Sequence, residues 1–210
     1  LNQHIGKPAK PVVQKGDQVL AGQLIAEADG FVSANIVSSC SGKVKAIEKR
    51  KNVLGTSDMS IVIENDGQYT LAEGIGTEVD YTTLTGSEIL DKVKAAGIVG
   101  LGGAGFPTHV KLAPKNPNDI RFVIANGAEC EPYICCDDQL MRNYADEIVG
   151  GLKIMLTLFP NAEGVILIEE NKPEAIAAME KACSGESNIR VHRVVPKYPQ
   201  GGERAIMDVV

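Results

Sequence analysis

Hydrophobic and polar positions follow two different patterns along this chain. Up to residue 66, short β-type runs alternate with glycine and Lys-Asn turns, whereas beyond residue 86 helical patterns alternate with continuous apolar runs. Regularly spaced short strands with turn signals are typical of a small β-sandwich or barrel. The strands expected in this first part are Gln18–Leu20, Leu24–Ala26, Phe31–Ser33, Gly42–Val44 and Ser60–Ile63.

The second part predicts a parallel sheet with helices on its faces. Residues 121–125 and 164–168 are apolar almost throughout, as parallel strands covered on both faces are, and residues 189–195 predict a third strand. Ser87 can cap a helix that ends near Ala96, and a short helix is expected before Pro114. Further helices are expected from Asp137 or Asp138 through Leu152, after Pro173, and after Gly201-Gly202.

These patterns predict an α/β protein with two domains. We expect an all-β module at residues 1–70, a linker at 71–86 that contains several glycines, and a Rossmann-like parallel-sheet domain at 87–210. The chain begins without a methionine and ends inside an apolar run, so we expect it to be an excerpt of a longer protein.

Composition and charge exclude one class of partner. The chain has 210 residues, 44% of them hydrophobic, with a formal net charge of −6. An acidic chain without a basic stripe cannot neutralise many phosphates, so nucleic acid is not expected as a partner. The one dense basic cluster, Lys49-Arg50-Lys51, is interpreted as a solvated turn.

Residues 100–108 contain four glycines within six positions, at 100, 102, 103 and 105. Missing Cβ atoms let a backbone approach a bound phosphate or ring. The spacing satisfies the Gly-x-Gly-x-x-Gly pattern of dinucleotide-binding domains, but that pattern follows a strand, whereas here it follows a predicted helix. A tight helix–helix turn is the structural alternative, although such a turn needs only one or two glycines.

A polar turn at residues 126–132 follows the first predicted strand of the sheet. Ligands bind beyond the carboxyl ends of strands in open α/β sheets, where Asn126, Glu129 and Glu131 offer hydrogen-bonding groups. Polar loops also follow the next two strands, at residues 169–171 and 197–203. Gly201-Gly202 can either cradle a phosphate at a helix N-terminus or form an ordinary turn. A solvated acidic turn is the alternative for residues 126–132.

The cysteines do not predict a metal site. Cys130, Cys135 and Cys136 form a C-x4-C-C pattern, which lacks the C-x2-C spacing of zinc and iron–sulfur sites. The three histidines are far apart and show no ligand spacing. We therefore expect no metal ligands within these residues.

Three motifs resemble the C subunit of the bacterial Rnf (Rsx) electron-transport complex. They are the glycine loop at residues 100–111, the turn at 126–133, and Tyr-Pro-Gln-Gly-Gly-Glu-Arg at 198–204. The flavin domain of that family is similar to the NADH-binding flavoprotein subunit of respiratory complex I. Residues 3–6, 15–19 and 22–23 resemble the barrel-sandwich module that precedes the flavin domain, without the lysine of biotinyl and lipoyl carriers.

The resemblance implies a noncovalent FMN that accepts a hydride from NADH and passes electrons singly to iron–sulfur centres. It implies the catalytic role, orienting NADH, for Glu129. The cofactor-binding residues that it implies are Gly100, Gly102, Gly103, Gly105, Phe106, Lys111, Asn126, Glu131, Tyr198, Gly201, Gly202 and Glu203. Cysteine motifs for two 4Fe–4S clusters are expected only in a C-terminal part of the family that is absent from these residues.

The resemblance also implies partners and a location. It implies a membrane electron-transport complex that translocates ions, with a ferredoxin-like subunit among its members, and a peripheral position at the cytoplasmic face of the bacterial inner membrane. Two alternatives stay open: a flavin-dependent cobalamin reductase of propanediol utilisation, and a nonenzymatic assembly subunit that has lost its flavin. The barrel-sandwich module favours the Rnf family over the first, and the joint presence of Lys111, Asn126, Glu129 and Glu131 argues against the second.

Overall fold

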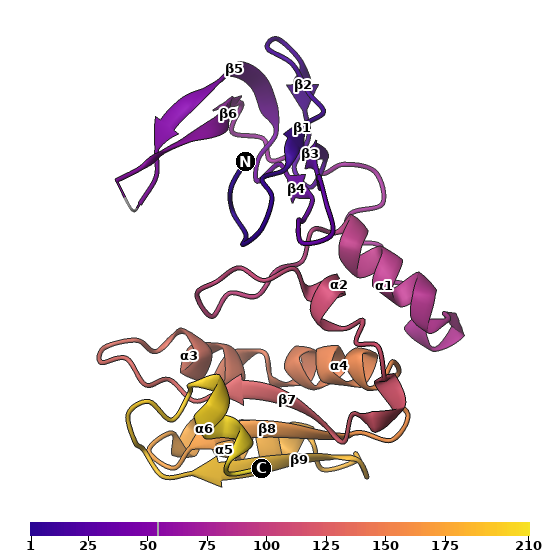
Figure 1. Cartoon of the computed structure of the whole chain (residues 1–210), viewed down its shortest axis with the longest axis vertical. Coiled ribbons are helices and arrows are strands. Elements are labelled where there is room, and N and C mark those ends of the chain that lie inside the picture. The colour runs from indigo at the N-terminus through magenta and orange to yellow at the C-terminus, as the bar shows by residue number, and fades with distance from the viewer. Residues whose placement is uncertain (54) are drawn as a thin grey trace. The chain divides into compact units, whose positions relative to one another are not determined.

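The computed structural model of the protein describes residues 1–53 and 55–210. The chain forms two compact units, Leu1–Pro114 and Lys115–Val210, which are coloured from indigo to magenta and from red to yellow in Figure 1. Each unit is described by itself below.

The first unit begins with two three-stranded antiparallel sheets among its described residues. One sheet has the order β1-β3-β4 and the other has the order β2-β5-β6. Apolar side chains from both sheets, among them Val19, Ile25, Ile36 and Val44, form a shared core. The predicted all-β fold of this part is confirmed. The strands are β1 (Lys10–Pro11), β2 (Gln18–Val19), β3 (Leu24–Glu27), β4 (Ile36–Val37), β5 (Gly42–Lys51) and β6 (Ser57–Asn65).

Two predictions for this part were wrong. Phe31–Ser33 is a turn rather than a strand, because the buried Ser33 hydroxyl bonds locally, donating to the Lys7 carbonyl and accepting the Asp29 N–H. Lys49-Arg50-Lys51 is the end of β5, paired with residues 57–59 of β6, rather than a turn. This stretch of the hairpin is exposed, so no apolar alternation reveals it as a strand.

The first unit also contains the segment that leads to the glycine loop. It holds the 3₁₀ helix η1 (Tyr81–Thr83), α1 (Gly86–Ala95) and α2 (Thr108–Lys111). Thr85 caps α1, not Ser87 as predicted, because Thr85 and Glu88 form a reciprocal capping box that places Ser87 inside the first turn. Beyond α1, Gly97 has a φ of +65°, and a Cβ there would lie 2.3 Å from the Asn35 carbonyl oxygen. α1 therefore ends directly against the β-sheet part of its unit.

The second unit is built on a parallel sheet, as predicted. Its strands β7 (Phe122–Gly127), β8 (Glu163–Glu169) and β9 (Ile189–Val194) pair in the order β7-β8-β9. Asn126 lies opposite Leu167, so the turn after β7 lies at the carboxyl edge of the sheet. The helices are η2 (Pro117–Asp119), α3 (Cys136–Asn143), α4 (Ala145–Leu156), α5 (Pro173–Ala182) and α6 (Glu203–Met207).

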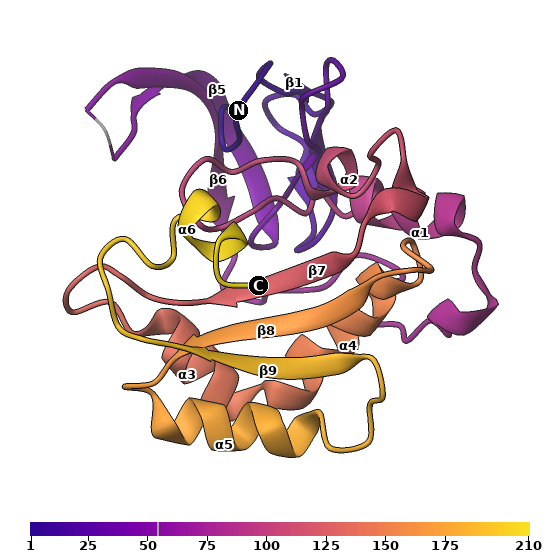
Figure 2. The ribbon, with the colours of Figure 1, turned by 60° about the horizontal axis from the view of Figure 1, so that its bottom comes forward.

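Helices cover both faces of this sheet (Figure 2). α3, α4 and α5 lie on one face, where a Cβ at Gly164 would come within 3.0 Å of Leu152 and Leu156 of α4. On the other face, Ile206 of α6 belongs to one core cluster with Leu167 of β8. Successive side chains of β8 point to opposite faces of the sheet, and those of residues 165–169 are buried on both faces. This arrangement explains why β8 has no polar face in the sequence.

One predicted helix is in fact two. The chain leaves the helical conformation at Tyr144, where φ is −134°, and this residue separates α3 from α4. The buried residues Met141 of α3 and Val149 and Leu152 of α4 nevertheless keep the spacing of one helix face. Because the periodicity runs through the break, the sequence pattern predicts a single helix.

Candidate functional site

Asn126 joins two loops at the carboxyl edge of the parallel sheet. Its Nδ2 donates to the Gly201 carbonyl oxygen at 3.0 Å, and its Oδ1 accepts the Ala128 N–H at 3.2 Å. The side chain thus connects the turn after β7 with the loop that follows β9. Both polar atoms that were predicted to face a ligand are engaged within the protein.

Gly201 packs too closely against the β7 turn for any side chain. A Cβ there would lie 2.4 Å from the Ala128 carbonyl oxygen and 2.9 Å from the Cys130 Sγ. The Gly201 N–H donates to Cys130 Sγ at 3.0 Å, and the Gly202 N–H donates to the Pro199 carbonyl at 2.9 Å. These two N–H groups are therefore paired inside the protein, as in an ordinary turn, rather than directed at a phosphate.

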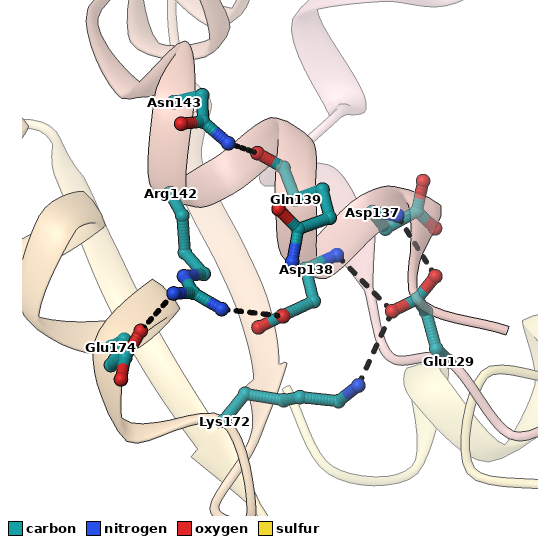
Figure 3. A network of polar contacts seen from close by, with 8 residues as sticks. All are labelled: Glu129, Asp137, Asp138, Gln139, Arg142, Asn143, Lys172 and Glu174. Atoms are coloured by element: carbon teal, nitrogen blue, oxygen red, sulfur yellow. Dashed lines mark hydrogen bonds and ion pairs between the residues drawn. The ribbon is translucent and has the colours of Figure 1, made fainter. Parts of the chain in front are cut away.

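Glu129 is the most constrained of the predicted site residues (Figure 3). Its side chain is only 2% exposed. Oε1 accepts the Asp137 N–H at 2.8 Å, and Oε2 accepts the Asp138 N–H at 3.1 Å, so Glu129 caps the N-terminus of α3. Two longer contacts complete its surroundings, from the Cys136 thiol at 3.5 Å and from the Lys172 ammonium at 3.4 Å. A carboxylate has about four acceptor positions, so every one of them is in use.

The surroundings of Glu129 favour its charged form. Burial by itself would raise the pKa of this carboxyl, but the hydrogen bonds from Asp137, Asp138 and Cys136 and the charge of Lys172 outweigh burial and lower it. The pKa values of two neighbouring groups shift in the opposite direction. The bond to Glu129 raises the pKa of the Cys136 thiol, and burial raises the pKa of Asp137. Glu129 is thus a buried anion that α3 and Lys172 stabilise.

We predict that Glu129 makes stability depend on pH. A carboxyl whose pKa is lowered by folding stabilises the native state above its ordinary value of 4.5, and this contribution is lost as pH falls through the folded-state pKa. The free energy of unfolding, measured with urea between pH 6 and pH 3, should therefore fall less steeply in Glu129→Gln than in the wild type. Glu180→Gln removes a half-exposed ion pair with Arg193 and should keep the wild-type slope. Equal slopes for Glu129→Gln and the wild type would contradict the prediction.

Lys172 was not predicted from the sequence. It directly follows the loop Glu169-Glu170-Asn171 after β8, and it reaches back across 43 residues to Glu129 with a side chain that is 18% exposed. Its position just past a polar strand end was the available signal. Arg142 extends the network in Figure 3 by pairing with Asp138 at 3.5 Å and with Glu174.

The glycine loop lies in the first unit and has its own supports. Val99 and Pro107 form an antiparallel bridge, closed by the Gly100 N–H to the Phe106 carbonyl at 2.9 Å. The Ile5 N–H donates to the carbonyls of Ala104 at 3.1 Å and Gly105 at 3.3 Å. A Cβ on Gly105 would lie 2.9 Å from the Gln3 carbonyl oxygen. The N-terminal segment therefore holds one side of the loop in place.

The tip of the glycine loop is open. A Cβ at Gly102 or Gly103 would have no atom within 4 Å, and Gly103 has a φ of +129°. Lys111, in the last turn of α2, is exposed, as are Glu131, Tyr198 and Glu203 in the second unit. The structure thus brings Asn126, Glu129 and Gly201 together at one edge of the sheet, and it gathers the glycines and Phe106 in one closed loop of the other unit.

The Glu129 cluster suits a helix cap better than a metal centre. Ligand atoms of Glu129, Cys136 and Asp137 lie within 4.8 Å of one another. However, both Glu129 oxygens already accept backbone hydrogen bonds from α3, at 2.8 and 3.1 Å. We therefore assign no metal to this cluster.

Comparisons with known proteins define the class of this chain. Residues 93–210 match the Nuo51 FMN-binding domain, and residues 1–68 match the RnfC barrel sandwich hybrid domain. The chain belongs to the family of Nuo51-type FMN-binding domains. Its relatives are C subunits of Rnf-type complexes, so the resemblance found in the sequence is confirmed, and with it the fold class of a barrel-sandwich module followed by a parallel-sheet flavin domain.

Several relatives match over nearly the whole chain, among them two C subunits of ferredoxin:NAD(+) oxidoreductase complexes. The C subunit of the proton-translocating ferredoxin:NAD(+) oxidoreductase complex of Clostridium ljungdahlii is 45% identical over 100% of this chain and 46% of its own length. The C subunit of the Na(+)-translocating ferredoxin:NAD(+) oxidoreductase complex of Acetobacterium woodii is 43% identical over 99% of this chain and 47% of its own length. This chain thus spans about half the length of these relatives. Among solved structures, an NAD+-reducing NiFe-hydrogenase is similar to this chain, with 27% sequence identity and a TM-score of 0.49. The match covers 58% of this chain and 23% of the hydrogenase chain.

The residues present fit a flavin nucleotide. The Nε2 of Gln200 is buried and has no hydrogen-bond partner among the described residues, so the loop after β9 holds a donor suited to a ligand. Within the first unit, the open space at Gly102 and Gly103 leaves the backbone of the glycine loop accessible. None of the helices in residues 1–53 and 55–210 combines the length and apolar character that a bilayer span requires.

Proposed function

We propose that this chain is the NADH-oxidising part of the C subunit of an Rnf-type, ion-translocating complex. The observation that carries the proposal is the 45% identity over the whole chain to the C subunit of a ferredoxin:NAD(+) oxidoreductase complex. The match to an FMN-binding domain over residues 93–210 supports it. FMN supplies the conversion between a hydride and single electrons, because nicotinamide carries two electrons and iron–sulfur centres accept one at a time.

The residues of the chain would bind and orient the two nucleotides. We propose that Gly100, Gly102, Gly103 and Gly105 let backbone approach the flavin, that Lys111 pairs with its phosphate, and that Phe106 supports the adenine end of NADH. We further propose that Asn126, Gly201 and Gly202 shape the flavin side of the sheet edge, together with the exposed residues Glu131, Tyr198 and Glu203.

Glu129 would act on NADH from within its helix cap. The two backbone bonds to α3 are 2.8 and 3.1 Å long, whereas the Lys172 ammonium is 3.4 Å away and the Cys136 thiol, at 3.5 Å, is a weak donor. Long contacts are weak and are the ones that a donor on a ligand can replace at low cost. We therefore propose that Glu129 orients the nicotinamide while its bonds to Asp137 and Asp138 keep the carboxylate in place.

The partners and the location follow from the same proposal. The chain would dock within a membrane complex at the cytoplasmic face of the bacterial inner membrane, as a peripheral part that delivers electrons to a ferredoxin-like subunit. The N-terminal module would serve as a structural and docking element, and its contacts from Ile5 to Ala104 and Gly105 support the structural part of that role.

An absorption spectrum of the purified full-length protein tests the function. We expect a flavin spectrum that NADH bleaches under anaerobic conditions and that a ferredoxin-type acceptor restores. A flavin bleached by NADH and restored only by a cobalamin would instead identify the propanediol-utilisation reductase. A full-length protein that purifies without flavin and binds none would identify a subunit that has lost its cofactor.

We also predict that residues 1–210 hold no iron–sulfur cluster. Cys130, Cys135 and Cys136 crowd into seven positions, and the thiols of Cys130 and Cys136 are engaged with Gly201 and Glu129. Residues 1–210 alone should therefore bind FMN but reduce a ferredoxin-type acceptor far more slowly than the full-length protein. Stoichiometric iron and acid-labile sulfide in purified residues 1–210 would contradict this division of labour.

A further inference from the structure

Gln200 differs from every other buried polar side chain that the structure describes. The buried polar residues in the described ranges are His4, Ser33, Ser38, Ser41, Glu169 and Gln200, and the Glu129 side chain is likewise only 2% exposed. His4, Ser33, Ser38, Ser41 and Glu129 each have a hydrogen-bond partner within the protein. The Gln200 residue is only 6% exposed, and its Nε2 has no partner among residues 1–53 and 55–210. A buried amide without a partner is costly, so such groups in native proteins call for an explanation.

The backbone around Gln200 is held at several points, so its inward direction is built into the loop. The Gln200 N–H donates to the Lys197 carbonyl. The next residue, Gly201, is bonded on one side to Asn126 and on the other to Cys130. These bonds fix the direction in which the Gln200 side chain leaves the backbone.

Most neighbours of Gln200 in this loop are exposed, so the burial of Gln200 is particular to that residue. Tyr198, two residues earlier, is 76% exposed, and Pro199 and Glu203 are also exposed. The loop lies at the carboxyl edge of a parallel sheet, where open α/β folds bind ligands. A fixed, buried, neutral donor at this edge has the character of a preorganised recognition group.

From these observations we propose that Gln200 is a flavin-binding residue whose Nε2 donates a hydrogen bond to a carbonyl oxygen of the flavin ring. A neutral amide matches a neutral carbonyl, whereas a phosphate at so buried a position would bring charge into a low-dielectric environment. This inference rests on the proposed function, and it adds a residue that the sequence motifs passed over between Tyr198 and Gly201.

The proposal predicts opposite effects on stability and on binding. Gln200→Leu removes the unpartnered amide and keeps the side chain at similar size. The flavin-free full-length protein should therefore gain melting temperature, by about 2–4 °C if the cost relieved is about one hydrogen bond. The same change should weaken flavin binding about tenfold or more, because the donor is lost. A residue with a merely structural role would not separate the two effects in this way.

The experiment measures melting temperature and flavin affinity on full-length protein stripped of flavin. Riboflavin and FMN are titrated separately by fluorescence quenching, with Gln200→Met as a second apolar variant if the leucine variant does not fold. Gln139→Leu changes an exposed glutamine of α3 and should leave both measurements at wild-type values.

The outcomes separate cleanly. Equal weakening for riboflavin and FMN, together with higher stability of the flavin-free variant, supports the assignment. Wild-type affinity in both Gln200 variants overturns it, as does weakening for FMN alone, which would place the contact at the phosphate. Lower stability with weaker binding also overturns it, because Gln200 would then be structural. A wild-type protein that binds neither flavin would refute the proposed function itself.

Discussion

Replacing Gly103 by valine is expected to abolish flavin retention while leaving the fold intact. The ideal Cβ position at Gly103 has no atom within 4 Å, so the new side chain meets no protein and instead fills the space that a ligand needs. The φ of +129° adds strain of about 1–3 kcal/mol for a β-branched residue, which a folded domain tolerates. The measurement is the flavin content of purified protein, from its absorption spectrum, alongside the melting temperature.

Gly16→Val is the matched control for this experiment. Gly16 also has a positive φ, at +102°, and a Cβ there also has no atom within 4 Å, but it lies in the turn before β2. The Gly16→Val variant should lose about as much stability as Gly103→Val but should retain its flavin. Equal flavin content in Gly103→Val and Gly16→Val would remove the glycine loop from the flavin site.

Replacing Glu129 by glutamine is expected to slow flavin reduction by NADH about ten- to a hundredfold. This range corresponds to a loss of about 1–3 kcal/mol for one positioned polar contact. The amide keeps the size of the carboxylate but removes the charge that Lys172 and the α3 N-terminus stabilise, and its NH₂ faces backbone donors. Stopped-flow bleaching under anaerobic conditions measures the rate, and a fluorescence titration measures FMN affinity.

Comparing the rate of flavin reduction with the affinity for FMN decides the role of Glu129. A positioning role for NADH requires the reduction rate to fall much further than FMN affinity does. Glu170→Gln, an exposed change at the end of β8, should alter neither quantity. Bleaching of Glu129→Gln at the wild-type rate would leave Glu129 as a helix cap with no part in the reaction.

Much of the fold could be predicted because its signals are local. The strand at 163–169 was found to within one residue, since a strand buried on both faces is apolar almost throughout. The strands at 122–127 and 189–194 were found to within two residues, although they are only partly buried. Pro173 indicated the start of α5 correctly, because its missing N–H is not needed in a first turn. The break at Tyr144 and the outer part of β5 were missed, because neither changes the apolar periodicity.

The sequence indicated where several of the predicted site residues lie, but it did not reveal their contacts. The sequence located Asn126, Glu129 and Gly201 at the sheet edge, and the structure shows them there. It treated their polar groups as free for ligands, whereas Asn126 bonds Gly201 and Glu129 caps α3. Lys172 and Gln200 were passed over because a lone lysine or glutamine in a loop carries no spacing signal.

By itself, the sequence determined the strands of the parallel sheet and most of the helices around it, which loops follow those strands, and the family to which the chain belongs. Periodicity and turn chemistry depend on near neighbours, so they can be read along the chain. Only the tertiary structure decided that Lys172 neutralises Glu129 across 43 residues and that Asn126 bonds Gly201 across 75. Those contacts depend on the order of the strands and on where each ends, because parallel strands bring loops far apart in sequence to one edge.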